Sequence, residues 1–188
     1  MPERVDLDMR NETTQPGPAQ PLSRRKLRRR SFELLFELAQ HPGVTMRELL
    51  QRCFENRIGG EQNNGGIALF APGDAEDGII VGEMDAGGRA FISDLCTSVS
   101  EHRKLLDTVL GRYPREWKFE RLGLPERIIL RMALAELLFM STPERIVINE
   151  ALELAKLYAE TDAPKFINGI LGAVSRDLDK IRQEQRLE

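Results

Sequence analysis

Apolar residues recur at three- and four-residue steps along most of this chain, which is the spacing of amphipathic helices. No segment alternates apolar and polar residues well enough to read as a confident strand. The pattern therefore predicts an all-α fold. The expected helices run from Ser23 to about Gln40, over a short segment after Thr45, from Ala90 to Gly111, from near Pro125, from Thr142-Pro143 to about Glu160, and from Asp162 to about Leu178.

Local signals place several of the helix ends. Pro42 and Gly43 should end the first helix. Thr45 and Glu48 form a Ser/Thr-x-x-Glu capping box, which is typical of a helix start. Pro125 suits a first helical turn, because its missing N–H costs nothing there. The helix that follows Pro125 is apolar nearly all round, so we expect it to be central in the fold.

Two segments depart from this pattern. Residues 1–23 are rich in Pro, Gln, Thr and Glu and predict a disordered arm, since little apolar surface is available to offset the ordering entropy. Residues 56–88 hold three Gly-Gly pairs and six acidic residues against one basic residue, Arg57. A flexible acidic loop is the favoured reading, and a small hairpin is the alternative. A phosphate-binding cradle is disfavoured, because no Gly-Lys-Ser/Thr pattern follows the glycines.

The bulk composition is that of an ordinary globular protein. The chain has 188 residues, of which 41% are hydrophobic and 30% charged, with a formal net charge of -3. No apolar run approaches the roughly 18–20 residues needed to span a bilayer, so we expect no membrane association and a cytoplasmic location.

The sequence offers no recognisable catalytic chemistry. His41 and His102 lack a partner at metal-ligand spacing. Cys53 and Cys96 lie among helix-face residues and are expected to be buried thiols without a disulfide or nucleophilic role. The carboxylates fall mostly on polar helix faces and form no acid–base pair or triad. We therefore expect no enzyme activity, no cofactor and no metal.

The strongest local signal is the run Arg24-Arg25-Lys26-Leu27-Arg28-Arg29-Arg30, with six basic residues in seven. Positive charge at a helix start opposes the helix dipole, so the run should be offset by an anion. Arginine offers a planar fork for phosphate and stacks on bases. The run favours nucleic acid over its alternative, a solvated helix face.

A second segment, 162–169, places Lys165, Phe166 and Asn168 in the first turns of the last helix, where backbone N–H groups favour anions. From these residues alone, a core role for Phe166 is the more economical interpretation, because apolar residues at helical spacing are usually buried.

These motifs together resemble a known family. Residues 147–156 (VINEALELAK) followed by 165–171 (KFINGIL) resemble the C-terminal signature of NusB proteins, and residues 122–137 resemble that family's central helix. The basic run stands where the family carries its arginine-rich first helix. The resemblance covers roughly 24–55 and 90–178. The arm and the acidic insert 56–88 are not part of the family's pattern.

The resemblance implies a fold of two packed helical subdomains, 24–118 (with the insert) and 119–188. It implies binding of boxA RNA together with a NusE-type small-subunit ribosomal protein, in a complex with other Nus factors that helps RNA polymerase resist termination. Carried over by motif, the residues expected to contact RNA are Arg24, Arg25, Lys26, Arg28, Arg29, Asp162, Lys165, Phe166 and Asn168. Phe36 and Glu126 match positions expected near the protein partner.

Two other functions stay open at this stage. NusB-like domains also occur in ribosomal-RNA cytosine methyltransferases, but this chain has no glycine-rich nucleotide-binding unit, so catalysis would require another polypeptide. The second alternative is a homodimeric protein-interaction module. Salt-sensitive RNA binding would argue against that module.

Overall fold

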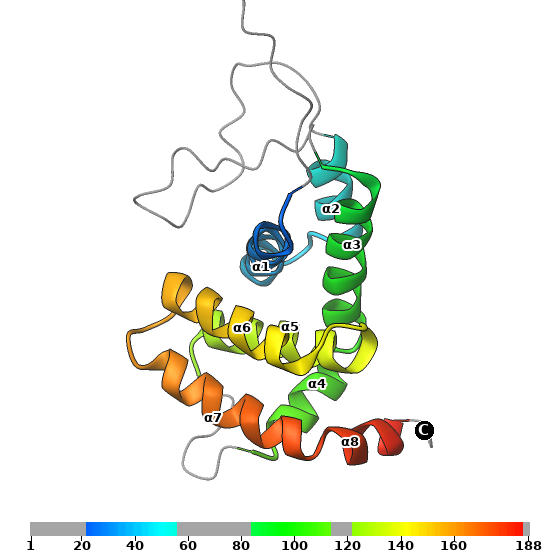
Figure 1. Ribbon diagram of the computed structural model, residues 1–188. Coiled ribbons are helices and arrows are strands. Elements are labelled where there is room, and N and C mark those ends of the chain that lie inside the picture. Colours follow the sequence, from blue (N-terminus) through cyan, green and yellow to red (C-terminus); the bar gives the residue numbers. More distant parts are fainter. Residues whose placement is uncertain (1–21, 56–83, 114–121, 186–188) are drawn as a thin grey trace, which may run out of the picture.

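The computed structural model describes residues 22–55, 84–113 and 122–185 (Figure 1). Within these residues there are eight helices and no strand, which confirms the predicted all-α class. The helices are α1 (Arg24–Gln40), α2 (Met46–Glu55), α3 (Ala86–Glu101), α4 (Arg103–Leu110), α5 (Leu124–Phe139), α6 (Glu144–Tyr158), α7 (Ala163–Arg176) and α8 (Leu178–Gln185).

Side chains cap the starts of α1 and α2 at the positions that the sequence predicted. The Ser23 hydroxyl accepts a hydrogen bond from the backbone N–H of Lys26 at 3.4 Å. The Thr45 and Glu48 side chains form the predicted reciprocal box: the Thr45 N–H donates to Glu48 at 2.8 Å, and the Glu48 N–H donates to Thr45 Oγ1 at 3.3 Å. Short polar side chains therefore satisfy backbone donors that would otherwise lack partners.

One predicted helix start was wrong, and two helix breaks were not predicted. Helix α3 begins at Ala86 instead of Ala90, because the Asp85 carboxylate accepts from the Gly88 N–H at 2.6 Å and so caps an earlier turn. The helix expected to run to Gly111 breaks at His102, and the last helix breaks at Asp177. The apolar stripe continues across both breaks because both helices of each pair face the same core, so periodicity alone did not reveal them.

Helix α5 is central, as predicted. Every side chain from 128 to 137 is buried, and α5 packs against α1, α3, α4, α6, α7 and α8. Charged residues in this buried stretch are paired: Arg131 donates to both carboxylate oxygens of Asp107, at 2.6 and 2.9 Å. One continuous cluster of buried apolar residues joins helices from both halves of the chain.

Helix α1 lies between the α2–α3 pair and the α6 side of the molecule (Figure 1). It packs against α2, α3, α5 and α6. This position brings the basic start of α1 beside helices that are more than a hundred residues away in sequence.

Several predictions fall on residues outside the described ranges. These are the arm, apart from Leu22 and Ser23, the part of the acidic insert from 56 to 83, and the 118/119 subdomain boundary.

Leu134 tests the central role of α5. It is fully buried, so Leu134→Ala should lower the free energy of unfolding by about 2–5 kcal/mol, through lost burial and a cavity. Leu157, which is 53% exposed on α6, is the matched control. Leu157→Ala should change the free energy of unfolding by about 0.5 kcal/mol or less. Urea unfolding followed by circular dichroism measures both, and equal losses would contradict this assignment of the core.

Candidate nucleic-acid interface

The first basic residue of α1 packs on an aromatic ring. The Arg24 guanidinium lies 4.6 Å from the centroid of the Phe91 ring of α3. Arg24 is exposed, whereas Phe91 is buried. A cation over an aromatic face is held without losing its charge, so Arg24 remains able to meet an anion.

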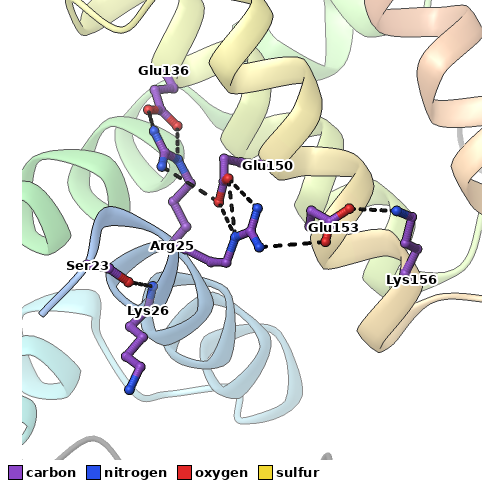
Figure 2. A network of polar contacts seen from close by, with 8 residues as sticks. Ser23, Arg25, Lys26, Glu136, Glu150, Glu153 and Lys156 are labelled. Atoms are coloured by element: carbon purple, nitrogen blue, oxygen red, sulfur yellow. Dashed lines mark hydrogen bonds and ion pairs between the residues drawn. The ribbon is translucent and has the colours of Figure 1, made fainter.

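Arg25 is held by carboxylates of α6. Its Nε donates to both Glu150 oxygens at 3.3 Å, and its Nη2 donates to Glu150 Oε1 at 2.9 Å (Figure 2). Its Nη1 lies 3.8 Å from Glu153 Oε2. The hydrogen bonds that Arg25 donates to Glu150 raise the pKa of Arg25, which therefore stays protonated. The Arg25 side chain is nevertheless 59% exposed.

Arg28 does not lie on the exposed basic face, contrary to the expectation that it holds RNA phosphate. Its side chain is 5% exposed and forms a two-point ion pair with Glu136 of α5, which is 3% exposed. Glu150 lies 3.9 Å away on the other side. The sequence analysis expected Arg28 to contact RNA like its neighbours, but α1 packs on α5 and turns the Arg28 side chain inward. Arg28 thus anchors α1.

Arg29 reaches the end of α6. Its Nε donates to the Tyr158 hydroxyl at 2.8 Å, and that hydroxyl donates to Glu33 at 3.3 Å. Burial, together with the charge of Glu33, raises the pKa of Tyr158 to about 12, so the hydroxyl keeps its proton. Lys26 points away from α6 (Figure 2) and is half-buried.

Tyr158 also lines a groove of about 630 Å³ formed by the start of α5, the end of α6 and the start of α7. Phe166 and Asp162 line the same groove. Phe166 is half-buried and packs against the core, so it has both a core face and a groove face. Lys165 and Asn168 are exposed on the same first turns of α7.

Asp162 stands at the N-cap of α7, as predicted, but its side chain makes no capping hydrogen bond. Its carboxylate is exposed at the rim of the groove. Lys165 makes no ion pair with any described residue. At the start of α7, the Asp162 carboxylate is therefore not used for helix capping, and the Lys165 ammonium is not used in an ion pair with a described residue.

Of the two residues expected near a protein partner, Glu126 is buried at the floor of the groove. Its Oε1 accepts from the Glu160 N–H at 3.4 Å, whereas Oε2 has no hydrogen-bond partner among the described residues. A Cβ at Gly123 would lie 2.3 Å from Oε2, so any side chain at this position would force the Glu126 carboxylate to move. Phe36 lies elsewhere, half-buried on α1, with its ring centroid 5.9 Å from that of Phe32.

Sequence reasoning missed the residues that organise this region. Glu136, Glu150 and Glu153 hold the arginines, and Tyr158 connects the basic helix to the groove. A signal existed for Glu136, since an acid inside an otherwise apolar helix needs a buried partner. No comparable signal marks Glu153, which reads as an ordinary solvated residue.

The described ranges contain no group of three or more His, Cys, Asp or Glu side chains placed to hold a metal ion. None of the helices described is both long and apolar enough to cross a membrane. Cys53 and Cys96 are buried and not disulfide-bonded, as predicted.

Comparison with known proteins gives matches to one family. The model of the NusB family matches residues 74–176. The transcription antitermination protein NusB of Pediococcus pentosaceus is 31% identical over 156 residues, which are 82% of this chain and 98% of the relative. The protein of the same name from Geobacter sulfurreducens is 44% identical over 94 residues, covering 50% of this chain and 68% of the relative.

Solved structures agree as well. A structure of T. maritima NusB superposes with a TM-score of 0.63 at 25% identity, covering 88% of this chain and 94% of that one. A chain from a structure titled "Crystal Structure of a Plectonemic RNA Supercoil" has the same fold, with a TM-score of 0.60 at 24% identity, covering 82% and 95%.

The fold and the basic first helix place this chain in the class of small all-helical proteins. Within that class, this chain belongs to the NusB family.

The Arg28–Glu136 pair generates a stability prediction. Arg28→Ala leaves Glu136 buried without a counter-charge and should cost about 3–5 kcal/mol of unfolding free energy. Arg25→Ala removes a cation that is 59% exposed and leaves Glu150 with Arg28 at 3.9 Å, so the loss of stability should be much smaller. Chemical denaturation compares the two. Replacing both buried partners together, by Arg28→Met with Glu136→Leu, should recover most of the loss. Equal stability of the two alanine variants would refute the anchoring role.

The buried thiols generate a second prediction. Burial raises the pKa of Cys96 to about 12, and its Sγ donates to the Ser31 carbonyl at 3.7 Å. Because the thiolate is the nucleophile, Cys96 should not react with an aromatic disulfide reagent at mildly alkaline pH until the protein is unfolded. Fast reaction of the native Cys53→Ser variant, which retains only Cys96, would show that this part of the core opens.

Proposed function

We propose that this protein is an RNA-binding transcription antitermination factor. It binds boxA RNA together with a NusE-type small-subunit ribosomal protein, and the complex, with other Nus factors, helps RNA polymerase resist termination in ribosomal RNA operons. It acts in the cytoplasm by binding and not by catalysis.

One observation carries the RNA-binding part of this proposal. The two segments that the sequence marks for RNA, the start of α1 and the start of α7, are connected through Tyr158. The Tyr158 hydroxyl accepts from Arg29 of α1, and its ring lines the groove that also holds Asp162 and Phe166 of α7. A single strand can therefore contact both segments along one continuous surface.

Each side chain has a distinct task on this surface. Arg24, Arg25, Lys26, Arg29 and Lys165 supply positive charge for phosphates. The groove face of Phe166 is suited to stack on an unpaired base, which is worth about 1–3 kcal/mol. Asp162 and Asn168 offer hydrogen-bonding groups to base edges or ribose hydroxyls. Arg28 contributes indirectly, by fixing the helix that carries the others.

The NusE-type partner is proposed to dock beside the RNA. Phe36 presents a half-buried aromatic ring on α1. Glu126 retains one carboxylate oxygen without a hydrogen bond to a described residue, at a groove shared with the RNA surface. A partner that contacts both the protein and the RNA strengthens RNA binding, and the RNA must strengthen partner binding by the same factor.

A NusB-like domain that serves an RNA methyltransferase is the second candidate. It shares the RNA surface but not the ribosomal partner. A partner effect on boxA affinity therefore separates the two functions.

The test is a binding titration of boxA RNA and a scrambled RNA over a salt series, with and without the ribosomal protein. About five phosphate contacts predict a slope of log K against log salt of roughly -3.5. Replacing Arg24 and Arg25 by alanine should make this slope less steep by roughly 1.4, because each lost phosphate contact removes about 0.7 from it. Replacing Arg103 and Arg112, exposed on and beside α4, removes the same charge and should leave the slope unchanged.

Preference for boxA that grows with the partner supports the proposal. Equal, weak binding of both RNAs, with no partner effect and the same slope in both double variants, would refute it.

A further inference from the structure

All three nitrogens of the Arg25 guanidinium face acidic side chains in the absence of RNA. Nε and Nη2 donate to Glu150, and Nη1 faces Glu153 at 3.8 Å. Phosphate recognition by arginine uses these same N–H groups. A phosphate can use the Arg25 fork only by sharing it with the carboxylates or displacing one of them.

The ionic contacts continue on both sides of Arg25 in alternating sign. Glu136 pairs with Arg28, Arg28 lies 3.9 Å from Glu150, and Glu150 pairs with Arg25. Beyond Arg25 follow Glu153 and then Lys156, whose Nζ lies 2.6 Å from Glu153 Oε1. Figure 2 labels five members of this row: Glu136 of α5, Arg25 of α1, and Glu150, Glu153 and Lys156 of α6. Three acids face three bases, so the row as a whole carries no net charge.

For two of the three acids, a structural role accounts for their position in the row. Glu136 neutralises a buried arginine, and Glu150, whose side chain is 12% exposed, lies between Arg25 and Arg28. Glu153 differs, because it lies at the exposed end of the row and its contacts are with two exposed cations. Neither contact is needed to neutralise a buried charge.

From this geometry we infer that Glu153 is an affinity-limiting residue of the RNA surface: its carboxylate is a counter-charge on Arg25 and Lys156 with which RNA phosphate must compete. The inference rests on the proposed function and identifies the residue that sets its strength.

The physical consequence is a like-charge penalty in the complex. A phosphate seated on Arg25 would lie within several ångströms of the Glu153 carboxylate, near enough for repulsion at a solvent-exposed site. Removing this negative charge should also release the ammonium of Lys156 for the RNA. Because both effects act between exposed groups, they should fade as salt screens them.

The experiment compares Glu153→Gln with Glu184→Gln in the full-length chain. Glu184 is a matched control, since it also makes an exposed ion pair, 2.7 Å from Arg112, but lies on α8. With boxA RNA at low salt, Glu153→Gln should bind about three- to tenfold tighter than the original protein, and the gain should shrink towards high salt. Glu184→Gln should not differ from the original. In an Arg25→Ala background, the gain from Glu153→Gln should be smaller, because the residue that it blocks is gone.

The outcomes separate this inference from the function beneath it. If the original protein prefers boxA and loses affinity on Arg25→Ala, but Glu153→Gln binds no tighter or binds more weakly, the counter-charge role is overturned while the proposed function stands. Equal gains from both glutamine variants would likewise overturn it, since net charge alone would then be responsible. If the original protein shows no boxA preference and Arg25→Ala has no effect, both the function and the inference fail.

Discussion

The buried ion pair between Arg28 and Glu136 fixes how the first helix sits on the rest of the molecule. Two charges removed from water must stay together, because separating them leaves each unsolvated. Successive residues of an α-helix are rotated by about 100°, so the inward direction of Arg28 determines the directions of its neighbours. Arg24 then falls about 40° to one side, over Phe91, whereas Arg25 and Arg29 fall about 60° and 100° to the other, towards α6. One buried contact thus places the side chains of the basic run in different environments.

This distribution changes the electrostatic interpretation of the run. In the sequence alone, residues 24–30 are a run of positive charges with no acidic residue among them. In the structure, carboxylates from α1, α5 and α6 face Arg25, Arg28, Arg29 and Arg30. The surface is therefore a set of arginines held in place by acids, and not a free cationic patch. Such a surface binds an anion by exchanging one counter-charge for another. If this surface binds RNA as proposed, its affinity depends on the exposed acid Glu153 as well as on the arginines. Binding also costs less side-chain entropy, because the guanidinium groups are already held in place.

The fold was largely predictable, and the site was predictable only in part. Periodicity found the helices because burial imposes the 3.6-residue repeat, and the capping residues Ser23 and Thr45 marked two starts correctly. It did not find the breaks at His102 and Asp177, where the core face continues across a change of direction. The basic run marked a region, but only tertiary packing decides that Arg28 is buried and Arg25 exposed. The connection through Tyr158 joins residues 129 positions apart, a relation that no local pattern contains.

The central claim is that the starts of α1 and α7 form one RNA surface joined at Tyr158. Hydrogen–deuterium exchange of the full-length protein, with and without boxA RNA, tests it most directly. The account predicts that RNA slows exchange in the first turns of both α1 and α7, and that Tyr158→Phe, which removes the hydroxyl between them, weakens the protection of both segments. Protection confined to one of the two segments, or located instead on α2, α4 or α8, would contradict it.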